Sequence, residues 1–245
     1  MSVFLAKVER WRPAAFRQSF GLPVSWILAV IQNESGGEVG AISKLGLDDY
    51  GLMQTKPAVV DTYNANNRSA PVTLAEIKGK TDADAEKQIR VGAWLIRRCA
   101  DRLHASNPQR WTWPAGTLRD EQILFSDLMY SAGITGFLNY RAEQIAAGRA
   151  DNFAALEAAA PGIKTQIPKR KFGHARRVLD LTRRDMAAGG PQPTPPEPAP
   201  PQPQPPRPSP TPPTRPTTPA PLVAGSGGAA ILLLIGLLAL AAGRN

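Results

Sequence analysis

The stretch Val24-Ser-Trp-Ile-Leu-Ala-Val-Ile-Gln-Asn-Glu34 decides the fold, because it predicts an apolar helix that ends on a single carboxylate. Its apolar positions follow the i, i+3, i+4, i+7 spacing of one helix face, and Glu34 continues that stripe. Pro23 suits the first helical turn, and Gly36 and Gly37 predict the end of the helix. We therefore expect an amphipathic helix with Glu34 at the edge of the core.

A carboxylate in that position is suited to acid–base chemistry. Burial favours the protonated form of a carboxyl group, which is the form that a general acid requires. Beside a sugar-sized groove, Glu34 could act as an acid and then as a base on a glycosidic bond. The helix pattern alone leaves a second interpretation open, in which Glu34 only accepts a hydrogen bond or caps a neighbouring helix.

Four blocks of sequence have the order and spacing of a known signature. The first joins Glu34-Ser35-Gly36 with Ser43 and Gly46, and the second is Gly51-Leu-Met-Gln54 with Pro57. The third is Gly92-Ala-Trp-Leu-Ile-Arg97, and the fourth is Met129-Tyr130-Ser131-Ala132-Gly133. Together they resemble the lytic transglycosylase (SLT, goose-lysozyme-like) family. The resemblance covers about residues 20–182.

The resemblance implies a lysozyme-like, mainly α domain with a cleft. It implies cleavage of the β-1,4 bond between N-acetylmuramic acid and N-acetylglucosamine in peptidoglycan, which leaves 1,6-anhydro ends. Glu34 would be the catalytic residue, and Ser35, Met53, Gln54 and Tyr130 would contact the substrate. No second carboxylate, cofactor or metal is required by this chemistry.

The chain departs from the family pattern at the second block. Two residues more than usual separate Gly46 from Gly51, and they bring in Asp48 and Asp49. If either carboxylate faces Glu34 across the cleft, it could activate water, and the enzyme would be a hydrolysing lysozyme. A non-catalytic module that binds the cell wall is a further alternative.

Two more departures lie near the other blocks. Ser131 stands where the family usually has Asn, and His174 or Phe172 falls near the place of a Tyr in the last motif. A Tyr contact to the sugar is therefore not expected at that point.

The rest of residues 1–190 also predicts helices and no long alternating strand. We expect helices near residues 3–20, 82–105, 117–130, 135–147, 150–159 and 170–186, with room for a small hairpin between 36 and 57. Trp111 and Trp113 could line the groove or close the core, and the core is favoured slightly.

The chain changes character after residue 190. More than half of residues 191–221 are proline, which predicts a disordered, extended linker. Residues 222–243 carry no charge and are long enough for a transmembrane helix. We expect a membrane anchor there.

The location of the enzyme follows from this layout. The first residues carry Lys7, Glu9, Arg10 and Arg12 early and lack a long apolar stretch, so no secretory signal is expected. The layout resembles that of the transglycosylase that membrane-containing, tailless bacteriophages carry in the virion. We expect the protein on a virion internal membrane or a bacterial inner membrane, acting on the cell wall.

Charge and composition bound the partners. The formal net charge of +9 would favour capture of anionic wall polymers. Basic residues between 169 and 184 could also suggest nucleic acid, but a solvated helix face is preferred, and no specific nucleic acid is expected. Cys99 is the single cysteine and is expected in the core; with only two histidines, no disulfide and no zinc site are expected.

Overall fold

The structure is a computed structural model, and it describes residues 2–43, 48–111, 119–160 and 167–189. The chain divides into two units, Met1–Ala199 and Pro200–Asn245, and every described residue lies in the first. The expected linker (191–221) and membrane helix (222–243) lie outside the described residues. Within the described part, no helix has both the length and the apolar character that a membrane span needs.

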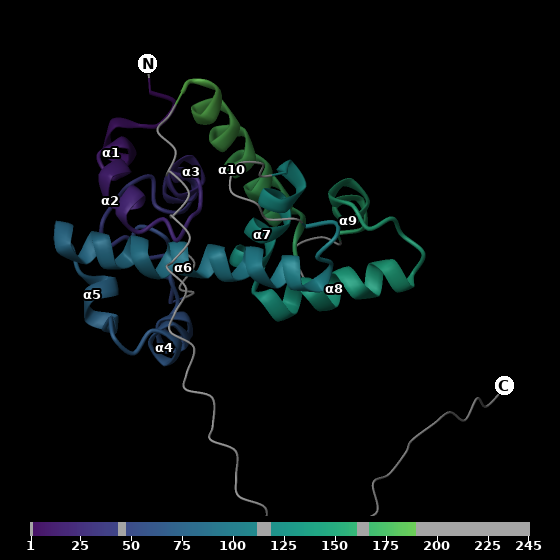
Figure 1. Ribbon diagram of the computed structural model, residues 1–245, viewed down its shortest axis with the longest axis horizontal. Coiled ribbons are helices and arrows are strands. Elements are labelled where there is room, and N and C mark those ends of the chain that lie inside the picture. The colour runs from purple at the N-terminus through teal and green to yellow at the C-terminus, as the bar shows by residue number, and fades with distance from the viewer. Residues whose placement is uncertain (1, 44–47, 112–118, 161–166, 190–245) are drawn as a thin grey trace, which may run out of the picture. The chain divides into compact units, whose positions relative to one another are not determined.

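The described residues are mainly helical, as the sequence predicts (Figure 1). The helices are α1 (Ala6–Glu9), α2 (Arg12–Arg17), α3 (Val24–Glu34), α4 (Pro57–Asn66), α5 (Leu74–Lys78), α6 (Asp82–Ser106), α7 (Asp120–Ala132), α8 (Ile134–Ala146), α9 (Phe153–Ala159) and α10 (Lys169–Ala187). No strand occurs in these ranges. The expected hairpin is reduced to two isolated bridges, which pair Tyr50 with Ile42 and with Thr55.

The first eight residues of helix α3 are buried on every side, so the prediction of an amphipathic helix was wrong. All residues from Val24 to Ile31 are buried, Ser25 included. The reason is that α1, α2 and α10 all pack against α3, which leaves it no solvent face. A helix that is apolar around its whole circumference belongs in the core, and α3 is the centre of this one.

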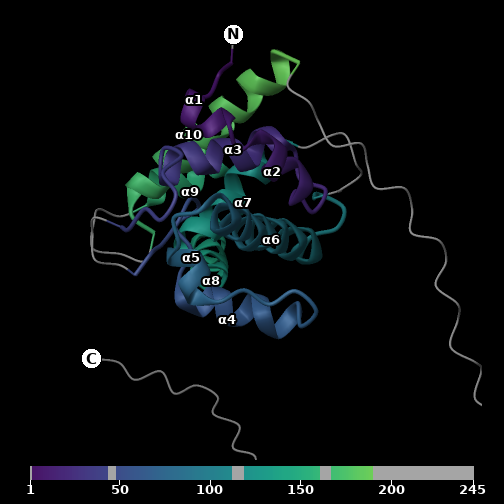
Figure 2. The same cartoon turned by 90° about the vertical axis from the view of Figure 1, so that its left-hand side faces the viewer.

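Helix α6 is the longest helix among the described residues, and its bounds agree closely with the helix predicted over 82–105. Thr81 caps it through a reciprocal capping box with Asp84. The apolar face of α6, which includes Ile89 and Ile96, is buried. Figures 1 and 2 show α4 and α5 beside α6, and α7 also packs on it. Cys99 of this helix lies in the core, as expected.

The single helix expected over residues 3–20 is two short helices instead. Pro13 has no amide N–H, and its ring conflicts with the carbonyl of the residue four positions earlier, Glu9, where α1 ends. The break has a structural use. Arg12 donates hydrogen bonds to both carboxylate oxygens of Asp185 at 2.8 and 3.1 Å, and Ser25 donates to the same group at 2.7 Å, which ties α2 and α3 to α10.

Gly133 separates α7 from α8. Its φ of +86° is in the left-handed region, where a side chain is disfavoured. Helix α7 therefore ends at Ala132, slightly later than predicted.

Trp111 is 1% exposed and belongs to the core, as the sequence favoured. Trp113 and the first two residues of the helix expected over 117–130 lie outside the described residues.

Candidate active site

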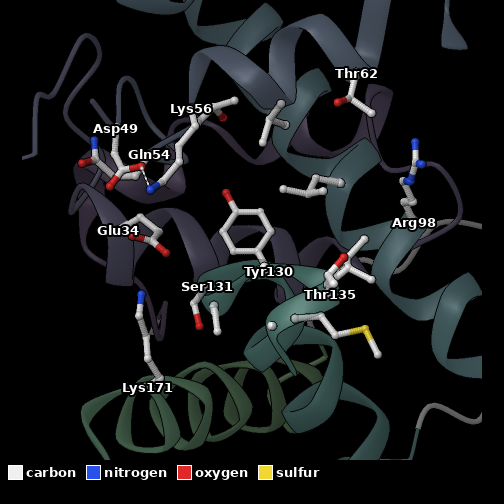
Figure 3. Close-up of a pocket in the computed structure, with 18 of the residues that line it drawn as sticks. Glu34, Asp49, Gln54, Lys56, Thr62, Arg98, Tyr130, Ser131, Thr135 and Lys171 are labelled. Carbon is white, nitrogen blue, oxygen red and sulfur yellow. Dashed lines mark ion pairs between the residues drawn. The ribbon is translucent and has the colours of Figure 1, made fainter. Parts of the chain in front are cut away.

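A cleft of about 630 Å³ opens where α3, α4, α6, α7, α8 and α10 approach one another (Figure 3). Its lining includes Glu34 from the end of α3, Asp49, Gln54 and Lys56 from the loop before α4, Trp94 and Arg98 from α6, residues 129–136 from the α7–α8 junction, and Arg170 and Lys171 from α10. The volume suits a bound oligosaccharide segment better than a single small ion.

Glu34 lies at one end of this cleft. It is the last residue of α3, and its side chain is 19% exposed. Figure 3 shows its carboxylate directed into the space that Asp49 and Tyr130 also border. The buried helix thus delivers one carboxylate from the core to the substrate side, which is the placement that acid–base catalysis requires.

Asp49 lines the same cleft, whereas Asp48 does not. The Asp49 carboxylate is 17% exposed and lies 3.8 Å from the ammonium of Lys56. Burial raises the pKa of Asp49; the Lys56 charge opposes this and the Glu34 charge adds to it. Asp48 is exposed and accepts a hydrogen bond of 2.9 Å from the Tyr50 hydroxyl. The structure therefore places one extra carboxylate near Glu34.

Gln54 and Tyr130, both predicted to contact substrate, line the cleft. The amide nitrogen of Gln54 donates to the carbonyls of Ala41 and Gly51 at 3.2 and 3.0 Å. Both amide hydrogens are thereby used on the loop backbone, so Oε1 is the amide atom left for a sugar hydroxyl. Burial, followed by the Glu34 charge, raises the pKa of Tyr130 well above its usual value, so its phenol stays neutral.

Ser35 and Met53, the other two predicted contacts, are not among the residues that line the cleft. The Ser35 hydroxyl donates to the carbonyl of Ile31 at 3.2 Å and accepts from the amide of Gly37 at 3.1 Å, so it closes the end of α3. Met53 is fully buried in the main core. Both side chains make structural contacts.

Two groups close to Glu34 were not assigned a role from the sequence. His174 of α10 places Nε2 at 3.2 Å from Oε1 of Glu34, and Asp127 of α7 contacts the opposite ring nitrogen. Phe172, the alternative residue for the last motif, is buried in the core. Asp127 lies three residues before Tyr130 on one helix face, and this spacing is the only sequence signal that could have found it.

Comparison with known families finds a match over part of the chain. Residues 14–116 match the family described as Transglycosylase SLT domain. These residues are therefore similar to part of a lytic transglycosylase SLT domain. No curated protein matches the chain. Because members of this family are lyases that cleave the glycosidic bonds of peptidoglycan, the protein is a peptidoglycan lytic transglycosylase.

The matched segment of the SLT domain supplies one wall of the cleft, with Glu34, Asp49, Gln54 and Arg98. The opposite wall comes from α7, α8 and α10, which follow the matched segment in the chain. Tyr130 is the clearest link between the two, since it belongs to α7 and faces Glu34 (Figure 3).

The SLT cleft is rich in cationic side chains. Lys56, Arg98, Arg170 and Lys171 all line it. Burial lowers the pKa of Lys171, and the Glu34 charge opposes that change. Arg98 lies over the Trp94 ring at 5.2 Å, on the side of the cleft away from Glu34 in Figure 3. This distribution suits a polymer with negative groups on either side of the cleaved bond.

Across the described ranges, no cluster of three or more His, Cys, Asp or Glu side chains is arranged to hold a metal ion. The cleft lining brings together the carboxylates of Glu34 and Asp49, several cations and the neutral phenol of Tyr130.

Proposed function

We propose that this cleft cleaves the β-1,4 bond between N-acetylmuramic acid and N-acetylglucosamine, with Glu34 acting first as acid and then as base. Glu34 gives its proton to the glycosidic oxygen as the bond to C1 breaks. It then takes the proton of the muramoyl 6-hydroxyl as that oxygen bonds C1 and closes a 1,6-anhydro ring. The 2-acetamido group of the sugar can stabilise the cationic intermediate, so one carboxylate suffices.

The observation that carries this proposal is the position of Glu34 at the end of a buried helix and at the edge of the cleft. The cations along the cleft add a reason for the substrate to bind, because the stem peptides of peptidoglycan carry carboxylates. Oε1 of Gln54 is free to accept a hydrogen bond from a sugar hydroxyl, and the Tyr130 ring forms part of the cleft wall.

Mass spectrometry of the products tests the proposal. The full-length chain is incubated with purified peptidoglycan, and the soluble muropeptides are analysed. Anhydro ends, each lighter by one water than a reducing end, are expected. Reducing ends alone would overturn the lyase mechanism, and binding without release of muropeptides would indicate a non-catalytic wall-binding module.

A muramidase that uses water is the second candidate function, because Asp49 lies in the same cleft as Glu34. In that case Asp49 would take a proton from water, which would attack C1. Asp49→Asn should then abolish cleavage, whereas the matched Asp48→Asn, at an exposed position outside the cleft, should not. Under the lyase mechanism, both variants should keep releasing anhydro products.

We further propose that residues 222–243 anchor the enzyme in a membrane and that it opens the cell wall locally during genome delivery by a bacteriophage. The uncharged, apolar sequence and the proline-rich spacer before it support this proposal. Flotation with liposomes tests it: the full chain should float and a chain ending at residue 221 should not. If the enzyme serves host lysis instead, it should be active when it is not attached to phage particles.

A further inference from the structure

His174 links the proposed acid to a second, deeper carboxylate. Its Nε2 atom lies 3.2 Å from Oε1 of Glu34, and its Nδ1 atom lies 2.8 Å from Oδ2 of Asp127. The three residues come from α10, α3 and α7, and α10 packs directly against both other helices. The mechanism proposed above uses neither His174 nor Asp127.

The contact between His174 and Asp127 is nearly closed to solvent. The side chain of Asp127 is 0% exposed and that of His174 is 13% exposed. Within the described residues, Oδ1 of Asp127 has no hydrogen-bond partner. Burying a carboxylate with one oxygen unpaired costs stability, so this arrangement is a poor choice for packing alone.

The position of His174 between two carboxyl groups favours a proton on each ring nitrogen. Burial would lower the pKa of His174, but the charge and hydrogen bond of Asp127, together with the contact to Glu34, outweigh it and raise the pKa to about 9. Burial raises the pKa of Asp127 itself, and His174 opposes that change. At neutral pH the ring is therefore an imidazolium between two carboxyl groups.

The other titratable or charged groups around this pair are Lys171 and Arg177 on α10, Tyr130 on α7, Cys99 on α6 and Asp49 in the loop before α4. Burial raises the pKa of the Tyr130 phenol and of the Cys99 thiol, so both are neutral at neutral pH. Burial lowers the pKa of Lys171 and raises that of Asp49. Among the described residues, His174 is the group of this set that forms an ion pair with Glu34.

We propose that His174 is a positioning residue for Glu34: Asp127 holds it as a cation, and it fixes the Glu34 side chain and stabilises the charge left there when the proton goes to the glycosidic oxygen. The proposal rests on the proposed function of Glu34. The proton moves from Glu34 to the leaving oxygen and returns from the 6-hydroxyl, while His174 keeps both of its own protons throughout.

The contact to Glu34 is electrostatic rather than a directed hydrogen bond, since Nε2–H of His174 does not point at Oε1 within hydrogen-bond geometry. The hydrogen bond to Asp127 is directed, and it sets the orientation of the ring. A carboxylate that orients a histidine, which in turn acts on the reacting group, is the logic of catalytic triads, with a carboxylic acid here in place of a nucleophile.

Kinetics of His174→Gln on purified peptidoglycan test the proposal, since glutamine keeps a donor but removes the charge. We expect turnover to fall about 10²-fold with little change in KM, because transition-state charge is what His174 stabilises. The pH profile should also change on its alkaline side, where the wild type loses the charge of His174. The matched control is His104→Gln on α6, outside the cleft lining, which should leave both quantities unchanged.

NMR of the imidazole signals provides a measurement that does not need activity. The chain has two histidines, so His174→Gln assigns the His174 signal directly. We expect its titration midpoint near pH 9, and a lower midpoint in both Asp127→Asn and Glu34→Gln. Circular dichroism shows whether each variant is folded.

The outcomes separate the two proposals. A His174 midpoint at or below pH 6.5, no response to Glu34→Gln, or wild-type kinetics and pH profile in a folded His174→Gln would each overturn the positioning role. A wild-type chain that cleaves no peptidoglycan, but in which the midpoint responds to Glu34→Gln, would uphold the coupling and refute the proposed function of Glu34.

Discussion

The hydroxyl of Tyr130 donates a hydrogen bond to the main-chain carbonyl of Met53. These residues belong to two segments that are 77 positions apart in the sequence, and the bond holds the loop before α4 against α7. Tyr130 therefore has two roles. Its ring borders the cleft, and its hydroxyl stabilises the turn that contains Met53. The cleft wall is held in place by the core through this contact.

Tyr130→Phe tests whether this brace matters. The substitution keeps the ring in the wall and leaves the Met53 carbonyl without its donor, so we expect a loss of about 1–3 kcal/mol in the free energy of unfolding. Urea unfolding measures it. Turnover should fall less than for His174→Gln, because the phenol does not exchange a proton. Unchanged stability would show that another donor satisfies the carbonyl.

Glu34→Gln tests the catalytic assignment. The substitution keeps the size of the side chain and removes the proton that the leaving oxygen needs, so turnover should fall by at least about 10²-fold. Muropeptide release measures this, and pelleting with insoluble peptidoglycan should show that binding persists. Normal release of muropeptides by the folded variant would sink the assignment.

The sequence predicted the helix that carries Glu34 but not the direction of every motif residue. Apolar spacing located α3 and α6, with Pro23 and Gly36 also marking the ends of α3. The order of motifs led to Glu34, Gln54 and Tyr130, which line one cleft. The alternation of residues in a short turn cannot reveal that Met53 points into the core, because no long period exists there to set a face.

The Glu34–His174–Asp127 chain lay beyond sequence reasoning for a different reason. Its members come from α3, α10 and α7, and only the packing of α10 between the other two brings them together. The sequence placed His174 near the last motif of the family, but the buried carboxylate that keeps it charged depends on tertiary contacts. The full burial of α3 was missed for the same reason.

Gly92→Ala tests the packing behind the cleft. A Cβ atom at Gly92 would lie 2.3 Å from Sδ and 2.7 Å from Cβ of Met53, both closer than contact distance. We expect a loss of about 1–3 kcal/mol from overpacking, measured by thermal unfolding. The matched control is Gly173→Ala on α10, where the nearest atom is 3.8 Å away, and where the better helix propensity of alanine should stabilise the protein slightly. Equal effects of the two substitutions would contradict this account.

The protonation of His174 should make the stability of the protein depend on pH in the alkaline range. The pKa of the ring is raised to about 9 in the folded protein from 6.5, so between these values the folded state holds one proton more than the unfolded state. The stabilisation is complete below pH 6.5 and is lost as the pH rises through 9, and it amounts to about 3 kcal/mol.

Urea unfolding at pH 6 and pH 10 measures this loss, with Asp127→Asn/His174→Gln as the reference because it removes both titrating groups of the pair. The wild type should lose about 3 kcal/mol more than the double variant over this interval. His104→Gln should follow the wild type. If the wild type and the double variant lose stability in parallel, His174 is not held as a cation by Asp127, and the electrostatic contact with Glu34 would have no charge to act through.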